Sequence, residues 1–261
     1  MNIPFYQVDA FSKKIFGGNP AAVCLLESWL DDKALQSIAA ENNLSETAFL
    51  VPKSKGRYYL RWFTPTVEID LCGHATLASA FVIFSFIDST LSAVDFETAS
   101  GLLSVTKSDE LLSMDFPSRM PIPTEIPPIL SEALGAEPVE VLKSRDMLAV
   151  FRDESIIKNI NPDFDKLKEI QDVFAIIVTA RGKKSDFVSR FFAPNAGIPE
   201  DPVTGSAHCT LIPYWADRLK KNQLHAFQFS KRGGELFCEN IGDRVRISGH
   251  AVLYAKGELH L

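Results

Sequence analysis

The strongest constraint on the fold is that landmarks of the sequence recur at an offset of 132 residues. The coinciding positions are turn glycines and apolar residues, and they occur in the same order in both halves, as expected for a duplicated unit. We therefore predict two similar domains. The matching pairs are Leu35 and Leu167, Ile38 and Ile170, Gly101 and Gly233, and the motifs Gly73-His74-Ala75 and Gly205-Ser206-Ala207.

The domain boundary is expected between Pro117 and Pro128, where FPSRMPIPTEIPP holds five prolines in thirteen residues. The first domain then spans residues 1–117 and the second spans 118–250, with 251–261 as a candidate strand that returns to the first domain.

Each half is expected to alternate strands with two kinds of helix. An amphipathic helix is predicted from Asp31 to about Glu41, with Leu35, Ile38 and Ala39 on one face. The run from Leu71 to Ile87 is apolar on every side, which predicts a helix buried in a core. Strands rich in β-branched and aromatic residues are predicted at 21–26, 48–51, 57–63, 94–98, 102–106 and 111–116.

Composition favours a small molecule as the main partner. The net charge is −6 and no basic stripe stands out, which argues against nucleic acid or an anionic membrane. The first residues lack the basic end and apolar run of a secretory signal, so we expect a cytoplasmic protein. The four cysteines and five histidines form no zinc motif, and no glycine-rich nucleotide loop occurs, so we expect neither metal nor cofactor.

The two Gly-x-Ala motifs at 73–75 and 205–207 are expected to begin the two buried helices. The start of a helix leaves backbone N–H groups unpaired and carries partial positive charge, which suits an anion. If the two ends face one cleft between the domains, a carboxylate could bind there. The alternative is that each glycine only eases a tight turn into a helix.

Four separated motifs resemble the phenazine biosynthesis-like (PhzF) family over nearly the whole chain. They are GNPAAV at 18–23, NLSETAF at 43–49, the Phe63–Ala75 run that contains EIDLCGHA, and EDPVTGSA at 200–207. The resemblance implies an α+β, diaminopimelate-epimerase-like fold of two pseudo-symmetric domains. Each domain is then a β-barrel-like sheet wrapped around a central buried helix, with the active site in the cleft between them.

The resemblance also implies the chemistry, a cofactor-independent isomerisation of a small cyclic carboxylic acid by proton transfer, and a homodimer. Glu46 would be the acid/base that moves the proton. The sequence alone would make Glu46 a solvated loop carboxylate, and only the motif reverses that interpretation. The other residues implied are His74, Asp201 and Ser206 as supporting catalytic groups, and Asn19, Ser45, Gly73 and Gly205 for substrate binding.

Two other interpretations stay open. Epimerases and racemases of related fold use one cysteine from each domain, and Cys72 could be such a thiol in an amino-acid epimerase, racemase or dehydratase. The second loop, however, has Thr204 at the matching position, and threonine is a poor acid or base. The third interpretation is a metabolite-binding or interaction module that has kept the fold without the chemistry.

Overall fold

A computed structural model describes all 261 residues, and the chain divides into two compact units. The first unit combines Met1–Asp115 with Ser248–Leu261, and the second is Phe116–Ile247. No helix combines the length and the apolar composition needed to cross a membrane.

The first unit is a curved sheet in the order β17–β1–β2–β3–β4–β6–β7–β8. Neighbouring strands are antiparallel except for the pairs β2–β3 and β4–β6, which are parallel. The short β5 pairs with β4. The strands are β1 (Asn2–Ala10), β2 (Asn19–Leu25), β3 (Glu46–Ser54), β4 (Arg57–Phe63), β5 (Glu68–Ile69), β6 (Ala93–Thr98), β7 (Gly101–Ser108), β8 (Leu111–Pro117) and β17 (Ala251–His260).

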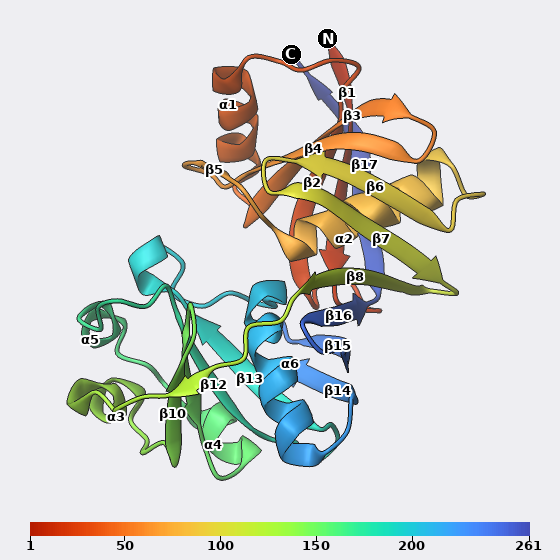
Figure 1. Cartoon of the computed structure of the whole chain (residues 1–261). Helices are drawn as coiled ribbons and strands as arrows, with labels where there is room; N and C mark the ends of the chain where they lie inside the picture. The colour runs from red at the N-terminus through yellow and green to blue at the C-terminus, as the bar shows by residue number, and fades with distance from the viewer. The chain divides into compact units, whose positions relative to one another are not determined.

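Two helices cross between the parallel strands of this unit. The helix α1 (Asp32–Asn42) connects β2 to β3, and Asp31 caps it by accepting a hydrogen bond from the Ala34 N–H. The helix α2 (Gly73–Val82) lies inside the curved sheet, as Figure 1 shows, and contacts β1, β2 and β3. Nearly all of its residues are buried, which matches the prediction of a central apolar helix.

The apolar run nevertheless ends as a different structure from the one predicted. The α-helix stops at Val82, and a π-helical turn, η1 (Ile83–Ile87), follows it. Phe86 and Ile87 are 38% and 43% exposed, so this end of the run is not in the core. Hydropathy did not reveal this because it does not distinguish a buried apolar residue from one on an apolar surface.

The second unit is a sheet in the order β9–β10–β11–β12–β13–β14–β15, and β16 leads from it back to β17. The pairs β11–β12 and β13–β14 are parallel. The strands are β9 (Ile122–Pro123), β10 (Glu140–Lys143), β11 (Met147–Val150), β12 (Ile176–Arg181), β13 (Phe187–Phe192), β14 (Gln223–Gln228), β15 (Gly234–Asn240) and β16 (Arg244–Gly249). The helices are α3 (Pro128–Leu134), α4 (Glu154–Asn159), α5 (Phe164–Lys168), η2 (Pro194–Ala196) and α6 (Gly205–Leu219).

The two units share one pattern of strand pairing. From β1 and from β10 onward, successive pairs are antiparallel, parallel, antiparallel, parallel and antiparallel. The second parallel crossover is α2 in one unit and α6 in the other. Gly101 and Gly233 both have positive φ at the corresponding hairpin turns. Each unit is thus a curved sheet around a central helix.

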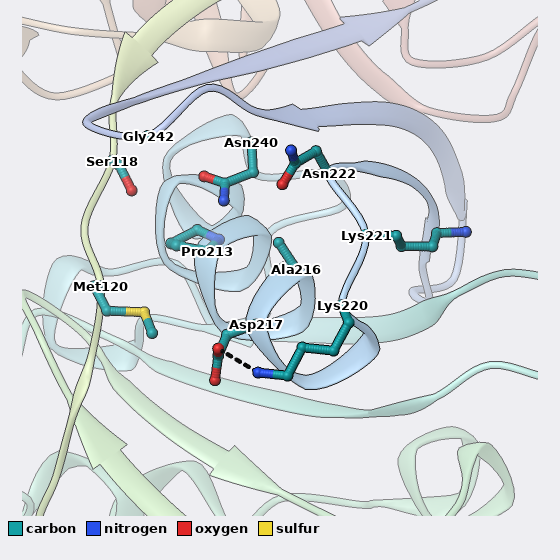
Figure 2. Close-up of a pocket in the computed structure, with 10 residues that line it drawn as sticks. All are labelled: Ser118, Met120, Pro213, Ala216, Asp217, Lys220, Lys221, Asn222, Asn240 and Gly242. Atoms are coloured by element: carbon teal, nitrogen blue, oxygen red, sulfur yellow. Dashed lines mark hydrogen bonds and ion pairs between the residues drawn. The ribbon is translucent and has the colours of Figure 1, made fainter.

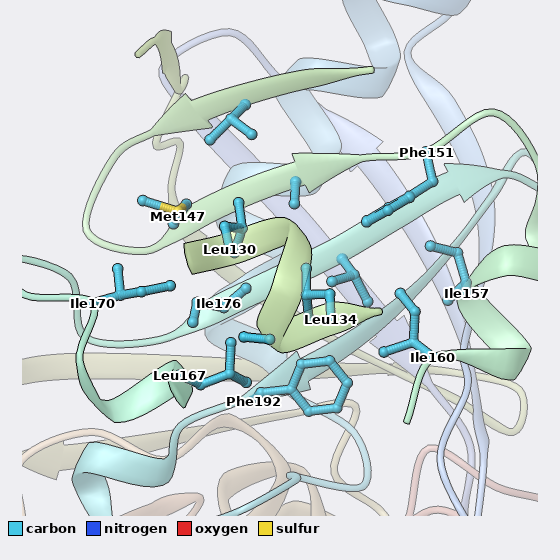
Figure 3. Packing of buried hydrophobic residues seen from close by; sticks show 14 of the residues in the cluster. Leu130, Leu134, Met147, Phe151, Ile157, Ile160, Leu167, Ile170, Ile176 and Phe192 are labelled. Carbon is cyan, nitrogen blue, oxygen red and sulfur yellow. The ribbon is translucent and has the colours of Figure 1, made fainter. Parts of the chain in front are cut away.

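Apolar side chains between the sheet and the short helices form the outer core of the second unit. Figure 3 shows Leu130 and Leu134 of α3 together with Leu167 of α5, packed with Ile176 and Phe192 of the strands. Burial of such side chains supplies most of the stabilisation of a unit this small.

The helix α6 contains Pro213 in its interior. Proline lacks an N–H, so the carbonyl of Cys209 loses its helical donor. The backbone N–H of Arg119 donates to that carbonyl at 2.9 Å instead. This replacement satisfies the oxygen from outside the helix and lets α6 remain one element.

Candidate active site

The candidate site of the first unit lies where two parallel strands and the central helix all begin. Asn19 is the first residue of β2, Glu46 is the first residue of β3, and Gly73 is the first residue of α2. Because β2 and β3 are parallel, their starts lie at the same edge of the sheet. The fold thereby gathers residues from three distant parts of the sequence.

Glu46 and His74 form a buried pair at this edge. Their side chains are nearly inaccessible, with 7% and 5% exposure for the two residues. Nε2 of His74 lies 3.0 Å from Oε2 of Glu46. The two atoms are out of line for a straight hydrogen bond, so both retain hydrogen-bonding capacity in a dry environment. A buried carboxylate and imidazole in this state are suited to exchanging a proton with a third group.

The other ring nitrogen of His74 faces Asn19 and Cys72. Nδ1 lies 3.2 Å from Nδ2 of Asn19 and 3.5 Å from Sγ of Cys72. Ser45 donates from Oγ to Oδ1 of Asn19 at 3.3 Å. Ser45 and Asn19 therefore hold the imidazole in place, and every first-unit residue singled out by the sequence contributes to this cluster or to the start of α2.

The surroundings shift the pKa values of His74 and Cys72. Burial alone would lower the pKa of His74, but the charges of Cys72 and Glu46 and the close polar contacts of the imidazole with both outweigh burial and hold the pKa well above its usual value. Burial raises the pKa of the Cys72 thiol, and Glu46 raises it further. The titration of the imidazole is therefore coupled to both Cys72 and Glu46.

One atom from each of Glu46, Cys72 and His74 lies within 4.8 Å of the other two, so these residues are the ones that could hold a metal ion. The thiol faces Nδ1 of the imidazole, whereas the carboxylate faces Nε2. The imidazole therefore links the thiol and the carboxylate, an arrangement that suits proton transfer as well as metal binding.

In the second unit, the start of α6 carries Gly205 and Ser206. Ser206 accepts a hydrogen bond through Oγ from Arg145 at 3.1 Å, and Arg145 is also bidentate to Asp146. Asp146 is completely buried directly before β11, the counterpart of β2. Burial raises the pKa of Asp146, although Arg145 and Arg119 oppose the shift.

Asp201 lies in the loop before α6, braced by Thr204 and Gln228. The hydroxyl of Thr204 donates to the Asp201 carboxylate. The side chain of the buried Gln228 donates to the Asp201 carbonyl at 2.9 Å and accepts from the Thr204 N–H at 2.8 Å. Sequence reasoning did not find Gln228, Arg145 or Asp146, because none of them belongs to a motif.

A family model described as phenazine biosynthesis-like protein (PhzC-PhzF) matches residues 8–257. The chain belongs to the phenazine biosynthesis-like (PhzF) family. A PhzF-family protein of Enterococcus faecalis, known from a crystal structure, is 50% identical, and each chain is covered completely with a TM-score of 0.98. The motif resemblance and the fold predicted from it are confirmed.

Two curated relatives extend this family assignment. An uncharacterized isomerase of Pseudomonas aeruginosa is 54% identical over 261 residues, with both chains covered completely. Phenazine biosynthesis-like domain-containing protein 1 of Mus musculus is 41% identical over 286 aligned positions, with 99% of each chain covered. This PhzF-family protein is an enzyme of the isomerase class, which disfavours a purely structural or interaction role.

The PhzF-family protein also has a surface pocket in its second unit, and none of the candidate site residues lines it. Figure 2 shows Pro213, Ala216 and Asp217 of α6 on one wall of this pocket and Met120 on another. Lys220 pairs with Asp217 there at 2.9 Å. This pocket contains no residue of the Glu46 cluster or of the Asp201 loop.

The pKa of His74 gives a direct test of the buried pair. In proton NMR the imidazole should titrate above its usual midpoint of about 6.5, and Glu46→Gln should lower that midpoint because it removes the neighbouring negative charge. Since the folded-state pKa is raised, the pair stabilises the fold fully below about pH 6.5 and loses this contribution as pH rises through the raised pKa. A midpoint that Glu46→Gln leaves unchanged would show that Glu46 is not the charge responsible.

Proposed function

We propose that this enzyme moves a proton between two carbons of a small unsaturated carboxylic acid, with Glu46 as the acid/base. Shifting a double bond requires a group that removes a proton from carbon and then delivers one elsewhere. A single carboxylate can do both if it accepts the proton as carboxylate and returns it as carboxylic acid. No external cofactor is needed for that sequence of steps.

The observation that carries the proposal is the buried contact between Glu46 and His74. The carboxylate is held in a dry place, and its Oε2 faces an imidazole at 3.0 Å without a straight hydrogen bond. In water a carboxylate would be solvated and a weak base toward carbon. Removal from water and a positioned neighbour are the usual means of making such a group effective.

The other residues have supporting roles in this proposal. His74 orients the carboxylate and, through its raised pKa, supplies positive charge near the reacting carbon. Asn19, held by Ser45, fixes the far side of the imidazole. In the second unit we assign supporting roles to Asp201 and Ser206. Asp201 accepts a hydrogen bond from Thr204, and Ser206 accepts one from Arg145.

The proposed substrate is a monocarboxylic acid because the central helix begins at the same site. The helix α2 has no side-chain hydrogen bond at its first turn, so the N–H groups there and the helix dipole can attract a carboxylate. The helix α6, which begins at Gly205, likewise has no side-chain hydrogen bond from its N-cap residue. The negative charge of Glu46 disfavours a dianion such as a diphosphate.

A second candidate function is an epimerase or dehydratase that uses Cys72 as the base. The contact between Sγ of Cys72 and Nδ1 of His74 at 3.5 Å favours it. Two observations oppose it. Burial and Glu46 raise the pKa of the thiol, which suppresses the reactive thiolate, and the matching residue in the second unit is Thr204.

Solvent exchange tests the proposed chemistry before the natural substrate is known. A panel of cyclohexadienyl and related unsaturated acids is incubated with the enzyme in D₂O, and carbon-bound deuterium is followed by NMR. At least one acid should gain deuterium at a carbon next to the double bond with the wild-type enzyme and not with Glu46→Gln. Exchange that proceeds equally in both proteins would refute Glu46 as the acid/base.

A further inference from the structure

The bend between β10 and β11 is tied to the start of α6 by two side-chain contacts. Oγ of Ser144 lies 3.0 Å from Oγ1 of Thr210, and Nη2 of Arg145 donates to Oγ of Ser206 at 3.1 Å. Ser206 and Thr210 are four residues apart, so they lie on the same face of the helix. This face of α6 is therefore held against the bend at two successive turns.

The guanidinium of Arg145 is itself fixed by a carboxylate and an aromatic ring. Its Nε and Nη2 donate to the two carboxylate oxygens of Asp146 at 3.0 and 2.8 Å, and Asp146 is completely buried. Its Cζ lies 4.6 Å from the centroid of the Phe174 ring. A bidentate pair and an aromatic face together set the plane of a guanidinium. The direction of the bond from Arg145 to Ser206 is therefore set as well.

The bond from Arg145 determines which way the hydroxyl of Ser206 can donate. A guanidinium has only donors, so Oγ of Ser206 must be the acceptor in this contact. The hydroxyl proton is then directed away from Arg145, and no group of the chain accepts it. Because Ser206 is partly exposed, a bound molecule can accept this proton.

The internal repeat places an equivalent contact in the first unit. There Asn19, the first residue of β2, contacts His74, the second residue of α2, at 3.2 Å. In the second unit Arg145, two residues before β11, contacts Ser206, the second residue of α6. In the first unit this contact holds a residue of the candidate site, and its counterpart is positioned to do the same for Ser206.

We propose that Arg145 is a positioning residue that directs the hydroxyl proton of Ser206 to an oxygen atom of the bound acid. The buried Asp146 fixes Arg145, Arg145 fixes Oγ of Ser206, and the hydroxyl donates to the acid. The positive charge of Arg145 strengthens this hydrogen bond and favours a negatively charged acceptor. The inference rests on the proposed function, because it takes a small unsaturated acid as the ligand.

The test is a double-mutant cycle on acid binding, measured by calorimetry with the full chain. The probe is the cyclohexadienyl or cyclohexenyl carboxylate that raises the wild-type Tm most. Ser206→Ala and Arg145→Gln should each raise its Kd about tenfold or more, because the first removes the hydrogen bond and the second misdirects it. The double variant should bind within about threefold of the weaker single variant, because Arg145 acts only through Ser206.

Arg218→Gln is the matched control for the loss of an arginine. Arg218 also donates to both oxygens of a carboxylate, that of Glu140, and lies over the ring of Tyr214. It is in the last turn of α6, whereas Ser206 is in the first. This variant should bind the probe with the wild-type Kd.

The Tm of each variant without acid separates positioning from a purely structural role. A structural role would lower the Tm of Arg145→Gln and leave the Kd of the folded protein unchanged. Should Arg145→Gln not fold, Arg145→Lys takes its place. Lysine keeps a positive charge beside Asp146 but lacks the planar fork that holds Asp146 and Ser206 at once, so it should also raise Kd about tenfold.

Three results would overturn the positioning role. They are a wild-type Kd for Ser206→Ala, a wild-type Kd for the Arg145 variant, and losses that multiply in the double variant, which would mean that Arg145 contacts the acid itself. Binding requires no turnover, so an acid that binds without exchanging deuterium would refute only the proton transfer. Exchange with a Kd that ignores both substitutions would refute only the positioning role, and a wild type that binds no acid would overturn both.

Discussion

Glu46→Gln should lower kcat by about a thousandfold or more while leaving the melting temperature nearly unchanged. Glutamine keeps the shape of the side chain and can still face His74, but it cannot accept a proton from carbon or return one. The measurement is steady-state turnover of the acid that exchanges deuterium, together with thermal unfolding of both proteins. Glu46 lies at the start of a strand and glutamine fills the same buried space, so the fold should tolerate the change.

Cys72→Ala is the discriminating control for this result. In the Glu46 mechanism the thiol is a neutral neighbour of the imidazole, and its removal should reduce kcat only mildly. Cys24→Ala is a matched control because Cys24 is also fully buried in the first unit, where burial raises its pKa to about 12. If Cys72→Ala were the inactive protein and Glu46→Gln the active one, the thiol-dependent epimerase would be the correct function.

Much of the architecture can be predicted from the sequence because helix caps, apolar periods and the internal repeat are local or periodic features of the chain. The helix from Asp31 is confirmed as α1, one residue later at each end, since an aspartate cap and a 3.6-residue apolar period both mark it. The prediction of a buried central helix holds for α2. The π-helical turn after Val82 could not be predicted, because it depends on contacts made elsewhere in the fold.

The candidate site can be predicted from the sequence only in part, because it too depends on contacts between distant segments. Composition and flanking residues predict that Glu46 is a solvated loop carboxylate, yet only 7% of this residue is exposed in the structure. That burial arises from the parallel pairing of β2 with β3, which no local pattern encodes. Arg145 and Asp146 escaped notice likewise, although a charged pair directly before the apolar run Met147–Val150 was a signal for a buried ion pair.

A small unsaturated carboxylic acid should stabilise the protein, and its amide should not. The uncapped start of α2 offers backbone N–H groups and roughly half a positive charge to an anion, whereas a neutral amide gains little from either. At a concentration about 100-fold above Kd the acid should add about 2.7 kcal/mol of stability, which a thermal-shift assay detects as a raised Tm. The comparison uses each acid and its own amide at the same concentration.

Two variants separate carboxylate binding from catalysis in this assay. Glu46→Gln removes a negative charge next to the helix start, so the acid should raise its Tm at least as much as that of the wild type. Gly73→Val places a branched side chain at the first residue of α2 and should abolish the shift, because the N–H groups are then no longer approachable. Equal shifts for acid and amide, or a shift that survives Gly73→Val, would show that the carboxylate binds elsewhere. Loss of binding in Gly73→Val with retention in Glu46→Gln would assign recognition of the carboxylate to the helix start and proton transfer to the carboxylate of Glu46.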